Sequence, residues 1–92
     1  MSDQDPREVA QLFNEIRQNL ANRYGELIGV RDLWLVMGFP SQEALQRAHA
    51  RGTVGLPIFE IEHRRGRFAL TTEVASWLVK SRHAATSDEG IE

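Results

Sequence analysis

The side chains with the most evident chemistry lie between residues 63 and 67, where three arginines and a histidine surround one glycine: His63, Arg64, Arg65 and Arg67. Guanidinium groups on a projecting turn suit contacts with phosphate groups or insertion into a narrow minor groove of DNA. A charged turn can also serve only to prevent strands from pairing at a sheet edge. Three arginines exceed what that second purpose needs, so we expect this turn to contact nucleic acid.

A second group of polar side chains lies on one face of the segment 42–50. The apolar residues of this segment recur at helical spacing and mark the face that packs inward: Ala44, Leu45 and Ala48. The opposite face then carries Gln42, Glu43, Gln46 and Arg47. Glutamine can form two hydrogen bonds with adenine in the major groove of DNA, and arginine can do the same with guanine. Such residues are also normal on any solvated helix face, and that alternative stays open.

Two further residues extend this polar surface. Ser41 precedes the helix and, together with the first backbone amides, suits a phosphate group, while Arg51 adds a positive charge at the other end. Glu43 opposes the approach of phosphate, although a carboxylate can accept a hydrogen bond from cytosine. Binding one duplex with both regions requires the arginines to face the Gln46 side without being held by Glu60 or Glu62.

The sequence gives little support for a catalytic or metal-binding site. The three histidines, His49, His63 and His83, lack the spacing of a helical metal pair, and the chain contains no cysteine. No nucleophile elbow, Walker-type phosphate loop or GxGxxG motif occurs in the sequence. We therefore expect no enzymatic activity, no cofactor and no metal, and we assign no catalytic residue.

The pattern of apolar residues predicts the helices that carry these side chains. A short helix is expected at 30–37, where Gly38 ends it, and another at 42–50, where Ser41 caps the start and Gly52 follows the end. Two short helices joined by a tight turn that contains glycine are typical of a helix-turn-helix.

The pattern changes after Gly55. Alternating residues predict a β-hairpin with strands near 58–63 and 67–70 and a polar turn at 64–66, and Thr71 is expected to cap a last helix. This order of elements predicts a mainly α fold with one β-hairpin, namely a winged helix-turn-helix preceded by a long N-terminal amphipathic helix.

That first helix is expected from Pro6 to about Arg23 and carries a stripe of large apolar residues: Val9, Leu12, Phe13, Ile16 and Leu20. The stripe either packs on the rest of the chain or forms a homodimer contact. The dimer is plausible because DNA-binding proteins of this kind often bind two half-sites as symmetric pairs. Both alternatives remain open.

The length and composition of the chain indicate how it is divided into segments and where the protein is located. The 92 residues allow one domain, which we divide into the N-terminal helix (1–26), the winged helix-turn-helix domain (27–82) and a disordered acidic tail (83–92). No apolar run is long enough to span a bilayer, and the acidic N-terminus is unlike a signal peptide. We therefore expect a cytoplasmic protein without a membrane partner.

The formal net charge of −2 hides an uneven distribution along the chain. Residues 47–82 contain seven basic residues and three acidic ones, a local balance of +4, whereas both ends of the chain are acidic. The basic middle favours contact with nucleic acid, and the low overall charge favours a protein partner.

Two stretches of the chain resemble the excisionase and AlpA-like group within the wider MerR-like superfamily. The first runs from Leu33 to Ser41 (LWLVMGFPS), and the second runs from Arg51 through Pro57 to the segment GRFALTTEVASWL, which ends at Leu78. The resemblance covers about Leu27 to Arg82 and implies a winged helix-turn-helix that binds duplex DNA. By position, Ser41, Gln42, Gln46 and Arg47 match the recognition helix of that group, and Arg64, Arg65 and Arg67 match its wing. The chain departs from the group in its lower positive charge and its long first helix.

The sequence thus predicts a small, sequence-specific DNA-binding protein, either a transcription regulator or an excisionase-like accessory factor of a mobile element. The helix 42–50 would enter the major groove while the arginine-rich turn contacts the backbone or minor groove. Double-stranded DNA and a second copy of the chain are the expected partners. The alternative is a protein-interaction module, such as an inhibitor or antitoxin-like adaptor built on the same fold.

Overall fold

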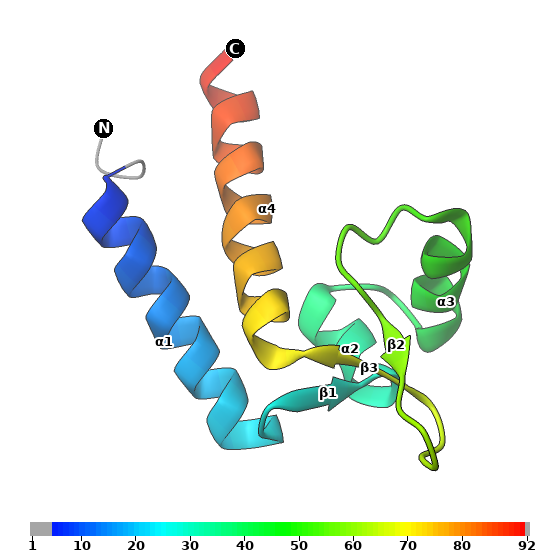
Figure 1. Cartoon of the computed structure of the whole chain (residues 1–92). Coiled ribbons are helices and arrows are strands. Elements are labelled where there is room, and N and C mark those ends of the chain that lie inside the picture. Colours follow the sequence, from blue (N-terminus) through cyan, green and yellow to red (C-terminus); the bar gives the residue numbers. More distant parts are fainter. Residues whose placement is uncertain (1–4, 92) are drawn as a thin grey trace.

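A computed structural model of the chain describes the backbone of residues 5–91 and the side chains of residues 5–85, and it is mainly helical with a small antiparallel sheet (Figure 1). The elements follow in the order α1 (Pro6–Tyr24), β1 (Leu27–Gly29), α2 (Val30–Met37), α3 (Gln42–Arg51), β2 (Phe59–Glu60), β3 (Arg67–Leu70) and α4 (Thr71–Ile91). The predictions of a mainly α fold and of the first three helices are confirmed.

The two short helices begin and end where the local chemistry requires it. The Ser41 hydroxyl accepts a hydrogen bond from the backbone N–H of Ala44 at 3.1 Å, which caps the start of α3. Gly38 and Gly52 take left-handed backbone conformations and end α2 and α3. The three residues between Gly38 and α3 therefore turn the chain tightly, and α3 packs against α2.

The sheet contains one strand more than the sequence predicts. Its order is β1-β3-β2, with both neighbours antiparallel to the central strand β3. The segment 27–29 is too short to show an alternating pattern, and it becomes a strand only because β3 lies beside it. This pairing places Gly29 opposite Phe68 and so fixes the start of α2 next to the hairpin.

The predicted hairpin exists, but its first strand is shorter than expected and its turn begins earlier. Only Phe59 and Glu60 pair with β3, whereas the prediction extended that strand to residue 63. The backbone N–H of Arg64 donates to the carbonyl of Ile61 at 3.0 Å, which closes a turn at 61–64. His63 adopts a positive φ of 67° in this turn, and such a residue cannot continue a strand. We refer to residues 61–66 as the hairpin loop.

The hydrophobic core is formed by the sheet, by α2 and α3, and by the first turn of α4. Nine buried apolar side chains form one cluster, and they come from β1, α2, α3, the segment after α3, β3 and the first turn of α4: Ile28, Val30, Leu33, Met37, Leu45, Ala48, Val54, Ala69 and Val74. The indole N–H of Trp77 donates to the carbonyl of Val54 at 2.8 Å and fastens the long connection after α3 onto α4. We call residues 25–75 the body.

The helices α1 and α4 project from the body side by side and run in opposite directions (Figure 1). We call α1 together with residues 76–91 of α4 the arm. None of the described side chains of the arm is buried, and the apolar stripe of α1 is half-buried along its length. At the base of the arm, Leu20, Tyr24, Trp77 and Leu78 pack against the core.

Two predictions about α4 need correction. Thr71 is the first residue of the helix, and its buried hydroxyl donates to the carbonyl of Gly25 at 2.6 Å, so that it links α4 to the end of α1. The tail predicted to be disordered from residue 83 continues the helix to Ile91. Alanines at 84 and 85 favour this continuation, since alanine has the highest helix propensity.

No helix in the described part of the chain is long and apolar enough to cross a membrane.

Candidate nucleic-acid interface

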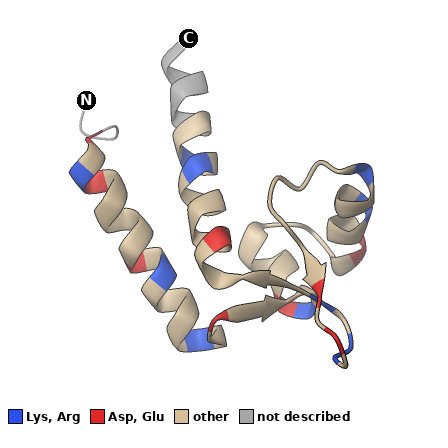
Figure 2. Ribbon diagram, in the orientation of Figure 1, with Lys and Arg blue, Asp and Glu red and all other residues tan. Residues whose placement is uncertain are grey.

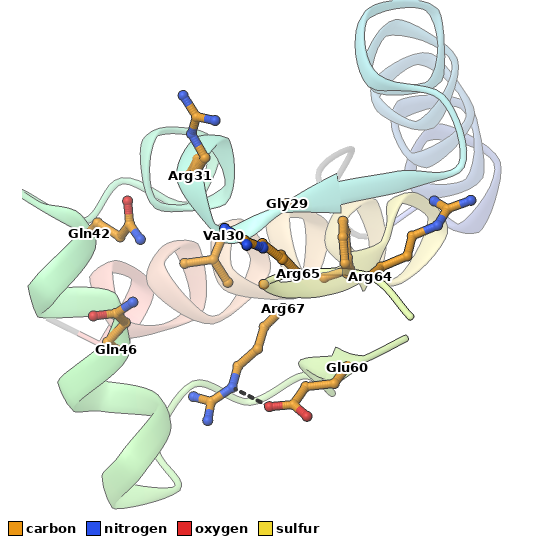
Figure 3. A pocket seen from close by; sticks show the side chains of 11 residues that line it. Gly29, Val30, Arg31, Gln42, Gln46, Glu60, Arg64, Arg65 and Arg67 are labelled. Carbon is orange, nitrogen blue, oxygen red and sulfur yellow. Dashed lines mark hydrogen bonds and ion pairs between the residues drawn. The ribbon is translucent and has the colours of Figure 1, made fainter. Parts of the chain in front are cut away.

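A cleft of about 440 Å³ lies where the start of α2, the first turns of α3 and the β2–β3 hairpin meet (Figure 3). The polar side chains that line it are Arg31, Gln42, Gln46, Glu60, Arg64, Arg65 and Arg67. Both regions that the sequence singles out, the helix 42–50 and the arginine-rich turn, therefore contribute to one concave surface.

The α3 side of the cleft presents amide groups. Gln42 and Gln46 lie one turn apart on the helix, and both side chains extend toward the cleft (Figure 3). Ser41 is half-buried and its oxygen already accepts the capping hydrogen bond from Ala44. Arg47 and Arg51 are exposed on α3 but do not line the cleft. The structure therefore brings two of the five predicted α3 residues to the cleft surface.

The hairpin side presents arginines in different directions. The guanidinium group of Arg67 projects between Glu60 and α3, whereas Arg64 points away from the Gln46 side (Figure 3). His63 is exposed at the tip, where its ring lies 3.5 Å from the carboxylate of Glu62 and does not line the cleft. The requirement that these arginines face Gln46 is thus met only in part. The requirement that Glu60 hold none of them is not met, because Arg67 contacts that carboxylate.

An ion pair occupies one of these arginines. The Nε atom of Arg67 lies 3.5 Å from Oε2 of Glu60, and the two residues stand opposite each other in the register of β2 and β3 (Figure 3). Both side chains remain largely open to solvent, with 49% and 71% of their surface exposed. An ion pair this exposed contributes little to stability, at most about 1 kcal/mol, and its partners exchange readily.

Arg31 is a member of the cleft that sequence reasoning missed. It lies in the first turn of α2 and is exposed. The antiparallel pairing of Gly29 with Phe68 brings the start of α2 beside β3, and therefore beside Arg67. Recognition of β1 as a strand would have revealed this neighbour, since a strand at 27–29 must carry residue 31 to the same end of the sheet.

The charges that line the cleft are four arginines against one glutamate, a local balance of +3. Around the cleft, on the hairpin, the start of α2 and α3, basic residues alternate with acidic ones, and the described arm carries residues of both signs too (Figure 2). Since the arginines are exposed, salt screens their field over about 8–10 Å at physiological ionic strength. A lining with this balance of charge favours anionic over cationic ligands, and salt should weaken any such contact.

No protein-family model matches the chain, and no curated protein or solved structure matches it either. Among the described residues, no group of three or more histidine, aspartate or glutamate side chains lies close enough together to hold a metal ion.

Proposed function

We propose that this chain binds double-stranded DNA, with α3 in the major groove and the β2–β3 hairpin on the phosphate backbone. The observation that carries the proposal is the shared cleft, whose lining combines two glutamines of α3 with four arginines from α2 and the hairpin. Amides at this spacing suit base edges and guanidinium groups suit phosphates, so one ligand can satisfy both.

The dimensions support this assignment. The ten residues of α3 span about 15 Å, and a major groove about 12 Å wide admits a helix of that kind. In this interpretation α2 and α3 form a helix-turn-helix and the hairpin is its wing. The resemblance to the excisionase and AlpA-like group supports the same architecture. The chain would act as a small transcription regulator or an accessory factor of a mobile element.

The first test measures binding of mixed-sequence duplex DNA by fluorescence anisotropy over a salt series. If each of the four arginines neutralises one phosphate, affinity should fall about a hundredfold between about 50 and about 200 mM salt. Arg65→Ala should weaken binding to most sequences and reduce the slope against salt by about one. Arg7→Ala is the matched control, because Arg7 is 94% exposed at the far end of α1 and should not matter.

The second test asks which residues read sequence. Selection of preferred sites from random duplexes, repeated with Gln46→Ala, should show a relaxed preference at one base position, with a cost of about 1–3 kcal/mol there. Arg47→Ala is the informative comparison, since Arg47 lies on the same helix but outside the cleft. Weak binding without salt dependence in the first test, or identical preferences in all variants here, would contradict the proposal.

A second candidate function, contact with another protein chain, is favoured by the half-buried apolar stripe of α1. The most available partner is a second copy, because the stripe belongs to every molecule. Light scattering across a dilution series tests the homodimer. Co-purification with one defined protein, together with no retention on DNA, would instead support an adaptor.

A further inference from the structure

We propose that the Arg67 guanidinium group is a phosphate site that Glu60 occupies in the free protein, so that the carboxylate and a DNA phosphate compete for one group. This inference rests on the proposed function and adds to it a residue that weakens binding. The Glu60–Arg67 contact lies inside the cleft, between the hairpin and α3 (Figure 3).

The backbone fixes this competition. Glu60 and Arg67 are direct partners across β2 and β3, so their side chains emerge from the same face of the sheet. Glu60 contacts Arg67 only at Nε, so a phosphate in the cleft that binds the Nη groups shares the guanidinium group with the carboxylate, and one that binds Nε displaces it. The contact is long, at 3.5 Å between Nε and Oε2, and both groups are exposed. A phosphate can therefore replace the carboxylate at small cost.

The carboxylate would also act on a bound phosphate directly. When a phosphate takes the guanidinium group, Glu60 remains in the cleft as an unpaired negative charge among the positive lining residues. Like charges at close range reduce the affinity, and salt screens the effect. Glu60 thus lowers affinity for any duplex without reading its sequence.

Glu62 provides a matched comparison two residues along. It carries the same charge and is similarly exposed, but it pairs with His63 at the tip and does not line the cleft. Removal of either carboxylate changes the net charge of the protein by one unit. A difference between the two variants therefore reports position rather than overall charge.

The experiment compares Glu60→Gln, Glu62→Gln, Arg67→Ala and the double variant Glu60→Gln/Arg67→Ala, with one mixed-sequence duplex at low salt. Since exposed ion pairs are worth up to about 1 kcal/mol, Glu60→Gln should tighten binding about threefold to fivefold and Glu62→Gln less than about twofold. In the Arg67→Ala background, the gain from Glu60→Gln should fall to the Glu62→Gln level, because the competition no longer exists.

Equal gains from Glu60→Gln and Glu62→Gln would overturn this inference, because overall charge would explain both. A full gain that persists without Arg67 would overturn it as well, since Glu60 would then act on the phosphate alone. Either result leaves the proposed DNA binding intact. Failure of the unaltered protein and of all four variants to bind duplex would instead remove the proposed function, and this inference with it.

Discussion

The body and the arm use their apolar residues in different ways. In the body, helices, strands and the segment after α3 all contribute to one cluster in which Leu33 and Leu45 have no exposed surface. In the arm, the two long helices pack against each other and, at one end, against the core of the body. Their larger described apolar side chains therefore remain half-buried. Regular structure is thus divided almost equally between the arm and the body, whereas the tight packing is in the body.

This difference places the candidate interface on the tightly packed part of the molecule. The cleft is built only from β1, α2, α3 and the hairpin, which are the elements that share the core. Close packing beneath the cleft holds the backbones of α2, α3 and β3, which carry Gln46 and two of the arginines, in fixed relative positions. No described residue of the arm lines the cleft, so we expect the arm to contribute to stability or to a contact with another partner.

The largest effect should come from the centre of the body. Leu45→Ala removes a side chain from α3 with no exposed surface and leaves a cavity under the recognition surface, so it should cost about 2–5 kcal/mol of unfolding free energy. Urea denaturation followed by circular dichroism measures the loss. The variant should also lose DNA affinity, because α3 itself shifts. A cost below about 1 kcal/mol would mean that the body is less tightly packed than described.

The positions of α2 and α3 were predictable because their signals are local. Ser41 caps its own helix, and Gly38 and Gly52 end helices through a backbone conformation that glycine adopts readily. The stripe Ala44, Leu45 and Ala48 faces inward at helical spacing, which correctly left Gln42 and Gln46 outside. These features depend on residues only a few positions apart.

The features that sequence reasoning missed depend on partners far along the chain. The three residues of β1 become a strand only beside β3, and with that pairing come the placement of Arg31 and the bond from Thr71 to Gly25. The Glu60–Arg67 pair follows from the hairpin register, which changed once the turn moved to 61–64. The roles of the predicted DNA-binding residues stay predictions.

The next largest effect on the unfolding free energy should come from Thr71, which links the body to the end of α1. Thr71→Val keeps the shape of a side chain that is 1% exposed but removes the hydroxyl that binds the Gly25 carbonyl. The lost hydrogen bond and the unsatisfied carbonyl should cost about 1–2 kcal/mol. Thr72→Val is the matched control at an exposed neighbour and should change the unfolding free energy by less than about 0.5 kcal/mol. Equal costs would assign the effect to helix propensity.

A smaller effect is expected within the arm. Ile16→Ala removes a half-buried side chain from the stripe of α1 and should cost about 1 kcal/mol, with DNA affinity unchanged. Thermal unfolding at several protein concentrations measures this cost. A loss as large as that of Leu45→Ala, together with a midpoint that rises with concentration, would break the comparison. It would show that a second copy buries the arm in solution.

The smallest effect on the unfolding free energy should come from the hairpin loop, where residues 62–66 are all exposed. His63 holds a left-handed conformation there, with φ of 67°, and asparagine tolerates that conformation better than most residues. His63→Asn should therefore raise the unfolding free energy by a few tenths of a kcal/mol, roughly the difference in backbone preference between the two residues. His83→Asn, at an exposed position of α4 with ordinary helical backbone, should give no gain. A loss of stability on His63→Asn would instead mean that the contact of the imidazole with Glu62, which the substitution removes, stabilises the turn more than backbone preference does.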